Sequence, residues 1–230
     1  ASTITGTLNI LAAGDITQSG ALNVTGISSF FGVNITLNNA SNDFVGAVSA
    51  NSSLLGGNVS LTDINAIDLG ASTVTGNLDV TAGGAVTQSG ALTVTGTTDV
   101  NAMGQDVFLN NFANDFGGTV SVDGDFVALF DVNDLELGAS TITNGARIIA
   151  AGNLTQSGAL NAQGSVSISA QDVTLIDASN DFQGTVFVTG NNVSLTDTNA
   201  IEFGDSTING DFMLTAGGAV TQVVDSLTLG

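Results

Sequence analysis

The chain lacks several residue types on which most enzymes and redox proteins depend. It contains no cysteine, histidine, proline, tryptophan or tyrosine, and Arg147 is its single basic residue. Without cysteine there are no disulfides, thiolate metal sites or cysteine nucleophiles, and this also suits a protein that is exported. Few enzymes could be built from the residues that remain. We therefore expect no catalysis and no cofactor.

Positive charge is nearly absent as well. The chain carries 21 aspartate and glutamate residues against one arginine, which gives a formal net charge of −20. Such a charge repels phosphate backbones and anionic lipid surfaces. No run of about 18 apolar residues is present, and the first residues lack the features of a signal peptide. We expect no nucleic-acid partner and no membrane insertion, and we expect the chain to be a mature or interior segment.

What the sequence does contain is repetition. The segment ASTITGTLNILAAGDITQSGALNVTG begins at residue 1, and similar segments begin at residues 71, 139 and 205, so the periods are 70, 68 and 66 residues. Regular periods of this kind are typical of stacked arrays and not of ordinary globular domains. The chain is therefore expected to be one array with repeats at 1–70, 71–138 and 139–204 and a partial repeat at 205–230.

The local pattern within each repeat indicates β-strands. Short runs such as TLNIL, ALNVTG and NVSLTD place apolar residues at every second position, and residues that favour helix interiors are scarce. Three landmarks recur in a fixed order, namely TQSG, NDF and an acidic turn. They begin at Thr17, Thr87 and Thr155, at Asn42, Asn114 and Asn180, and at Asp63, Asp131 and Asp197. This predicts an all-β parallel β-helix, or solenoid, with about three coils per repeat and about ten in all.

Two residue classes are expected to shape each coil. Alternate apolar residues should point inward and form ladders along the axis. In the first repeat these are Leu8, Ile10, Ile16, Leu22, Val24, Ile35, Leu37, Phe44, Val48, Val59, Leu61, Ile67 and Leu69, with Phe116 and Phe182 as the later counterparts of Phe44. Glycines should occupy sharp turns with positive φ. They are Gly20, Gly90 and Gly158, and Gly26, Gly96 and Gly164.

The acidic turns are the candidate metal site. Aspartate and asparagine oxygens at alternate positions could hold Ca²⁺, which prefers hard oxygen ligands. The same residues also favour turns because their side chains bond to nearby backbone amides, and we favour this second interpretation. The candidate ligands are Asp63 with Asn65, Asp131 with Asn133, and Asp197 with Asn199. The preceding Asn-Asp pairs should stack one coil away at the same corner.

Two functional alternatives remain open at this point. Paired carboxylates could serve a glycosidase, but the residues that position a sugar are missing and the carboxylates are spread evenly. A binding module for ice, glycan or a host receptor could use outward threonines, although a good β-former on an outer face explains them equally. These residues are Thr3 and Thr5, Thr73 and Thr75, Thr141 and Thr143, and Ser206 and Thr207.

The run LGASTVTGNLDVTAGGAVTQSGALTVTGTTDV, from Leu69, resembles the repeat regions of filamentous-haemagglutinin-like exoproteins. These are bacterial surface adhesins exported by two-partner secretion. The resemblance covers essentially the whole chain and rests on the style of its repeats. It implies a right-handed parallel β-helix, an extracellular or cell-surface location, and a stalk or fibre that presents adhesive tips to a host or neighbouring cell. It assigns no catalytic or binding residue.

The two ends of the chain also carry an expectation. The closing SLTLG resembles the runs that precede each new repeat, and residue 1 starts with AST. The last coil would therefore continue directly into another first coil. We expect an excerpt of a longer array or a subunit that stacks end to end, with lateral association in a fibre as a further possibility. The leading hypothesis is a structural stalk or filament segment.

Overall fold

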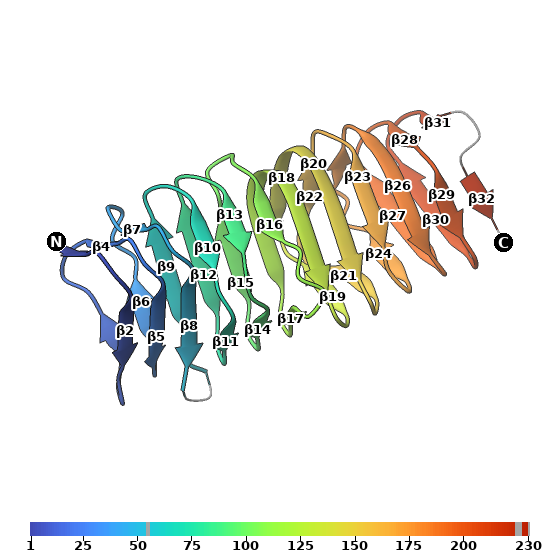
Figure 1. The fold of residues 1–230 in the computed structure, drawn as a ribbon. Coiled ribbons are helices and arrows are strands. Elements are labelled where there is room, and N and C mark those ends of the chain that lie inside the picture. The colour runs from blue at the N-terminus through green and yellow to red at the C-terminus, as the bar shows by residue number, and fades with distance from the viewer. Residues whose placement is uncertain (54–55, 224–226, 230) are drawn as a thin grey trace.

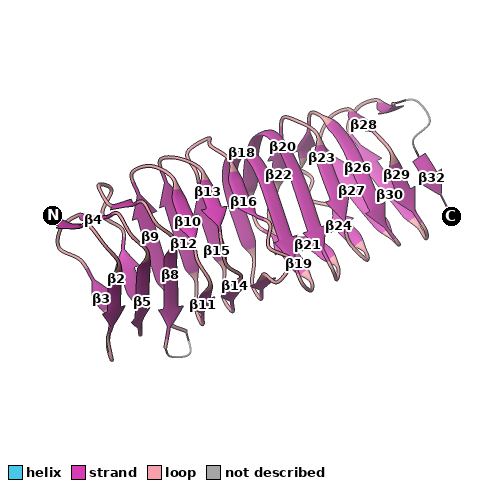
Figure 2. Ribbon diagram, viewed as in Figure 1, coloured by secondary structure: helices cyan, strands magenta, loops and turns pink. Residues whose placement is uncertain are grey.

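The computed structural model describes residues 1–53, 56–223 and 227–229, and every regular element in them is a β-strand (Figures 1 and 2). All pairings given between strands are parallel, and the strands stack from one end of the molecule to the other as a β-solenoid of about 11 turns. The predicted fold class is therefore confirmed. Within the described residues no helix is long and apolar enough to span a membrane. The closing SLTLG run includes residues 226 and 230, which lie outside the described residues.

The strands are short, and most contain two to five residues. In the first half they are β1 Ser2–Ile4, β2 Leu8–Leu11, β3 Ile16–Thr17, β4 Leu22–Val24, β5 Ser28–Gly32, β6 Ile35–Leu37, β7 Asp43–Phe44, β8 Val48–Ser52, β9 Val59–Asp63, β10 Ile67–Leu69, β11 Ser72–Val74, β12 Leu78–Ala82, β13 Val86–Gln88, β14 Leu92–Val94, β15 Thr98–Asn101, β16 Val107–Leu109 and β17 Asp115–Phe116. In the second half they are β18 Val120–Asp131, β19 Leu135–Leu137, β20 Ser140–Ala150, β21 Leu154–Gln156, β22 Leu160–Ala162, β23 Val166–Ser169, β24 Val173–Leu175, β25 Asp181–Phe182, β26 Thr185–Gly190, β27 Val193–Asp197, β28 Ile201–Phe203, β29 Ser206–Ile208, β30 Phe212–Ala216, β31 Val220–Gln222 and β32 Leu227–Leu229.

The number of turns in each repeat follows from one ladder of residues that stack on successive turns. It starts at Thr3 and passes through Asn23, Asp43, the turn at residues 63–65, residues 81–82, Asn101, Asp123 and Thr141, with Ala82 paired to Asp63 and Thr81 paired to Asn101. Thr3 and Thr141 open the first and third repeats, and seven steps separate them along this ladder. Two repeats therefore take seven turns, and one repeat takes three and a half.

The half turn places successive repeats on opposite edges of the rod. Thr73 opens the second repeat, and in the sequence it lies midway between Asn65 and Ala82, which are successive positions on the Thr3 ladder. It belongs instead to a ladder with Thr93 and Asp115. The prediction of about three coils per repeat and ten in all is thus refined to three and a half and about 11. The three landmarks mark three turns, and the remaining half turn has no landmark of its own.

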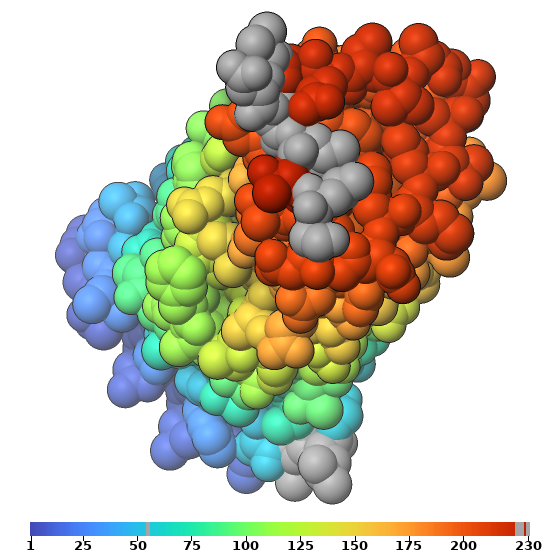
Figure 3. Space-filling model, turned by 90° about the vertical axis from the view of Figure 1, so that its right-hand side faces the viewer, coloured from blue at the N-terminus to red at the C-terminus, as the bar shows by residue number. Residues whose placement is uncertain are grey.

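The core is formed by the inward ladders that the alternation predicts. Phe44, Phe116 and Phe182 are each 1% exposed, so the recurrent phenylalanine is a buried residue of every full repeat. The other predicted residues are also buried, except for three in the first turns. Leu8, Ile10 and Leu22 are only half-buried and pack against the buried cluster. Figure 3 views the rod obliquely from its C-terminal end, with the C-terminal turns in front and the earlier turns behind them.

The prediction for the turn glycines is wrong in its physical reason. Among the described glycines only Gly56 and Gly104 have a positive φ. A Cβ at Gly96 would lie 2.6 Å from the carbonyl oxygen of Gly76, one turn away, and a Cβ at Gly26 would lie equally close to the carbonyl carbon of Gly6. Adjacent turns stack at about 4.8 Å, so backbone passes directly over backbone at these corners. Glycine is needed there for close approach between turns and not for a left-handed conformation.

Replacing Gly96 with alanine should therefore destabilise the rod by about 1–3 kcal/mol through overpacking against the neighbouring turn. Gly14→Ala is the matched control, because a Cβ at Gly14 would meet no atom within 4 Å. Thermal unfolding followed by circular dichroism measures both. Equal melting temperatures for the two variants would contradict the close-approach explanation.

Candidate functional site

The candidate acidic turns are buried caps of the backbone. Asp63 is 2% exposed. One of its carboxylate oxygens accepts a hydrogen bond from the Phe44 amide of the preceding turn at 2.7 Å, and the other accepts from the Asn65 amide at 2.9 Å. The carboxylate therefore links two turns and closes its own turn, as the turn interpretation predicts.

The second repeat has the same arrangement, and the third repeat has part of it. Asp131 is 3% exposed and accepts from the amides of Phe116 at 2.8 Å and Asn133 at 2.8 Å. Asp197 is 1% exposed and accepts from the Phe182 amide at 3.1 Å through one carboxylate oxygen, while its other oxygen, Oδ2, is buried without a hydrogen-bond partner. Each buried phenylalanine is thus held by an aspartate one turn further along the chain.

The asparagines of these turns bind the exposed carboxylates beside them. The Asn65 side-chain amide donates to Asp43 at 3.2 Å, and the Asn133 amide donates to Asp115 at 3.0 Å. In the third repeat the Asn199 amide donates to Asp181 at 2.8 Å. The prediction that these pairs stack at one corner is confirmed, and an amide placed next to a carboxylate reduces repulsion without a metal.

This geometry supports the turn interpretation over a calcium cage. The oxygens of Asp63 and Asp131 are already occupied by amide donors, and the neighbouring carboxylates receive an asparagine amide. In the part of the chain that the structure describes, no group of three or more aspartate or glutamate side chains is placed so that it could hold a metal ion. The candidate residues are brought together in pairs, by hydrogen bonds of their own.

Burial changes the acidity of the capping carboxylates. Loss of water raises the pKa of Asp63, Asp131 and Asp197 above the ordinary aspartate value, and repulsion from the neighbouring Asp43, Asp115 or Asp181 adds to it. The backbone amide bonds act in the opposite direction but do not cancel the rise. The folded state therefore holds protons to a higher pH than the unfolded chain does.

A raised carboxyl pKa has a definite consequence for stability. Where the folded state binds more protons than the unfolded state, the free energy of unfolding falls as pH rises through the folded pKa. The rod should therefore melt at a higher temperature at about pH 4, close to the ordinary aspartate pKa, than near pH 7. The triple variant D63N/D131N/D197N should show a flatter pH profile. A melting temperature that falls as pH is lowered from 7 to about 4 would contradict these pKa directions.

A second buried polar unit joins the TQSG and NDF landmarks. Asn42 is 0% exposed, and its side-chain oxygen accepts from the Gln18 side chain at 2.7 Å and the Leu22 amide at 2.9 Å. Its side-chain nitrogen donates to Gln18 at 2.9 Å and to the Leu37 carbonyl at 2.9 Å. Gln18 also donates to the Gly20 carbonyl. We call this unit the Gln–Asn clamp. It recurs as Gln88 with Asn114 and as Gln156 with Asn180.

A third unit was missed by sequence reasoning, which placed Ser206 on the outer face. Ser206 is 4% exposed, donates to the Gly204 carbonyl at 3.0 Å and accepts from the Val188 amide of the previous turn at 3.0 Å. Ser72 and Ser140 make the equivalent bonds. The signal was present in the sequence, because a serine preceded by Leu-Gly or Phe-Gly and one more residue opens each of these repeats.

The outward threonines do not continue as threonine rows. The row that starts at Thr3 continues with Asn23 and Asp43, and the row at Thr141 continues with Asn161 and Asp181. These side chains differ in size, charge and hydrogen-bonding capacity from one turn to the next. The regular spacing that an ice-ordering face needs is therefore broken along both rows.

The repeats of this chain are those of a described family. Residues 1–51, 56–123, 124–189 and 190–230 match the family described as repeats of unknown function (DUF5649). The chain belongs to this family. The comparison with curated proteins finds no match, and neither does the comparison with solved structures. The second, third and fourth matches begin at residues 56, 124 and 190, so the family divides the same array at a different corner from the predicted repeats.

The DUF5649 repeats also carry a ladder of side chains along one edge. The Asn34 side-chain oxygen accepts from the Asn58 amide, Asn58 accepts from the Asn77 amide, and Asn77 accepts from the Thr97 amide. The same pattern runs from Asp134 through Asn153, Asp172 and Asn192 to Asp211. Each side chain caps a backbone amide of the next turn, so polar residues here connect turns and do not converge on one point.

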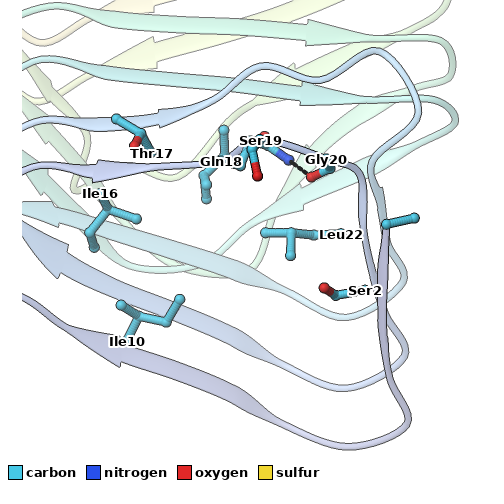
Figure 4. A pocket seen from close by; sticks show the side chains of 10 residues that line it. Ser2, Ile10, Ile16, Thr17, Gln18, Ser19, Gly20 and Leu22 are labelled. Atoms are coloured by element: carbon cyan, nitrogen blue, oxygen red, sulfur yellow. Dashed lines mark hydrogen bonds between the residues drawn. The ribbon is translucent and has the colours of Figure 1, made fainter.

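A hollow opens at the N-terminal end of this DUF5649 array (Figure 4). Ile10, Ile16 and Leu22 point into it, and Gln18 and Ser2 lie at its polar side. These residues belong to the core ladders and to the first Gln–Asn clamp. The hollow is therefore the uncovered end of the core, with the same lining that the next turns bury.

Proposed function

We propose that the chain is a structural segment of an extracellular bacterial filament or of the stalk of a surface adhesin, with no catalysis and no required cofactor or calcium. The observation that carries this is the repeated polar system. The Asp caps, Gln–Asn clamps and serines each bond backbone or side chains of adjacent turns, and each recurs once per repeat. Such a system adds stiffness along the axis, and in the described residues these side chains bond to adjacent turns and do not converge on a reacting atom.

The proposed location and partners are supported by the resemblance of the repeats to a known family and by the net charge of the chain. The resemblance to filamentous-haemagglutinin-like repeats supports a cell-surface location and contact with a host or neighbouring cell. The charge of −20 keeps the rod soluble and away from nucleic acid and anionic membranes. The most frequent partner of the rod would be another copy of itself, by end-to-end or lateral association. A ligand-binding solenoid for a receptor, glycan or ice is the alternative.

Labelling of intact cells tests the location and the fibre role together. An antibody raised against the chain should decorate fibres on unpermeabilised cells of the source organism in immunogold electron microscopy. The control is the same antibody on cells in which the reading frame has been deleted. Label found only inside permeabilised cells would contradict the proposal.

A further inference from the structure

A group of apolar side chains with one arginine lies on the outer surface of the second repeat and of β20, the first strand of the third repeat. Phe108 of β16, Phe126, Ala128 and Phe130 of β18, and Arg147 and Ile149 of β20 alternate with core residues, so they point away from the core. Pairing of β16 with β18 and of β18 with β20 places them on three adjacent turns. Phe112 lies beside them and is 69% exposed. We call these seven residues the aromatic patch.

The aromatic patch is packed within itself. The rings of Phe112 and Phe130 lie 4.8 Å apart between centroids, and those of Phe108 and Phe126 lie 6.1 Å apart. The Arg147 guanidinium lies 5.1 Å above the Phe130 ring, within cation–π range. Ala128 and Phe130 face outward yet are only 4% exposed, because these neighbours cover them. The group therefore presents a continuous and ordered surface.

The other repeats show that the fold does not need this patch. Two equivalent sets of positions begin in repeat 1 and in repeat 3, and each runs into the opening strands of the repeat that follows. Their residues are polar apart from Ala40, Ala178 and Met213. In the order Phe108, Phe112, Phe126, Ala128, Phe130, Arg147 and Ile149, the counterparts are Thr36, Ala40, Asn58, Ser60, Thr62, Asp79 and Thr81 in the set that begins in repeat 1, and Thr174, Ala178, Asn192, Ser194, Thr196, Met213 and Thr215 in the set that begins in repeat 3.

The same turns are therefore built three times, twice with a polar face and once with an aromatic one. β6, β9 and β12 pair in repeat 1 as β16, β18 and β20 pair in repeat 2, and β24, β27 and β30 do so in repeat 3. Exposed aromatic side chains cost solubility, and contiguous apolar surface on a soluble protein marks interaction sites. Folding does not require aromatic residues at these outward positions, whereas binding of a partner to this face would explain why they replace polar ones.

We propose that the aromatic patch is a lateral contact between two copies of this rod, arranged antiparallel about a two-fold axis. Charge identifies the partner. The partner must supply apolar surface and tolerate an acidic neighbourhood, and the single cation of the chain lies inside the patch. Elsewhere two rods of charge −20 repel each other, and this is the one place where each offers the other a positive group.

The order of residues across the turns is self-complementary. Along the row that crosses the patch, Thr87, Phe108, Ala128, Arg147 and Ser167 follow one another on successive turns. An axis through the small Ala128 sets Arg147 of one copy over Phe108 of the other, twice by symmetry. It also sets Thr87 opposite Ser167. Contacts of this isologous kind close at two copies and do not propagate.

The strength of the contact should depend on salt in an unusual direction. The patch covers about three turns, or roughly 15 Å along the rod, so it forms only the centre of an interface and the affinity should be modest. Salt screens the repulsion between two acidic rods but leaves apolar contact in place. Association should therefore increase as salt is raised from about 0.05 to 0.5 M.

Sedimentation velocity of the whole chain at both salt concentrations tests the pairing. We expect a dimer that gains population with salt. The variant F108T/F126N/F130T/I149T, which installs the residues of repeat 1, should keep the β-sheet circular dichroism and associate at least about tenfold more weakly. Arg147→Asp should do the same, while Met213→Asp, which adds an aspartate at the equivalent position of repeat 3, should leave association unchanged. A parent chain that stays monomeric throughout would overturn the proposal.

Cysteine cross-linking tests the antiparallel geometry, because the chain has no cysteine of its own. A mixture of Thr87→Cys and Ser167→Cys chains should form mixed disulfides across the contact. Ser167→Cys alone should not, since the two Ser167 positions would lie about four turns, or roughly 19 Å, apart. Preferential Ser167→Cys homodimers would overturn the antiparallel pairing.

The inference extends the proposed rod function, and the two can fail separately. A monomer in every condition would remove the lateral contact and leave the structural role in place. A dimer on a protein found only inside cells would keep the contact and remove the surface role.

Discussion

Replacing Phe116 with aspartate should separate the rod into two parts that unfold independently. Phe116 is 1% exposed, and its burial alone is worth about 3–5 kcal/mol by comparison with Phe→Ala substitutions in cores. Aspartate also places an unpaired carboxylate beside the buried Asp131, whose oxygen already accepts the amide of residue 116. In a stacked array each turn is stabilised by its neighbours, so a broken turn uncouples the two sides.

Calorimetry should therefore show a single transition for the parent chain and two transitions for the Phe116→Asp chain. The first of these two should occur at a clearly lower temperature than the transition of the parent. Ala113→Asp is the matched control, since it introduces the same charge three residues away on an exposed side chain. It should shift the melting temperature little. If Phe116→Asp melted at the temperature of the parent, the inward assignment of the recurrent phenylalanine would be wrong.

The second large effect is expected at the Gln–Asn clamp. Asn114 is 0% exposed and bonds to the Gln88 side chain, the Leu92 amide and the Leu109 carbonyl. Asn114→Leu keeps a similar volume but leaves these groups buried and unpaired. Each orphaned group costs about 1–3 kcal/mol, so a loss of roughly 3–5 kcal/mol is expected.

Chemical denaturation measures this loss directly. Asn110→Leu, at an exposed position in the same turn, is the control and should change the free energy of unfolding by less than about 0.5 kcal/mol. Equal values for the two variants would show that the clamp contributes no more than a surface asparagine does.

Much of the fold could be predicted because the same residue patterns recur in each repeat of the sequence. Alternation identified the inward ladders, and the recurrence of Phe44, Phe116 and Phe182 identified a buried position that one copy alone would not reveal. The acidic turns were recognised as turns because aspartate and asparagine bond locally. Their bond to the phenylalanine amide of another turn, as from Asp63 to Phe44, depends on the stacking register.

The features that escaped prediction all depend on that register. The length of a repeat does not state how many residues make a turn, so the half turn that moves Thr73 to the opposite edge from Thr3 could not be derived. The sequence alone does not show whether Gly96 is a glycine because its φ is positive or because the backbone of the adjacent turn lies too close for a Cβ. Ser206 lies on the same side of its strand as the buried Ile208, and its bond to the Val188 amide of the preceding turn explains why a polar residue is enclosed there.

The aromatic patch was overlooked for a related reason. Phe108, Phe126 and Phe130 are apolar residues in alternating strands, and the sequence pattern treats them like core residues. Comparison of equivalent positions separates them, because a core position is apolar in every repeat whereas Phe130 is replaced by Thr62 and Thr196. Differences between repeats therefore carry the functional information that their similarity hides.

Cryo-electron microscopy of the native cell-surface material tests the central claim most directly. The account predicts continuous filaments with turns about 4.8 Å apart and with surface features that recur every seven turns, or roughly 34 Å, along one edge. Discrete globular particles, or a filament whose edge features recurred every three turns, would contradict it.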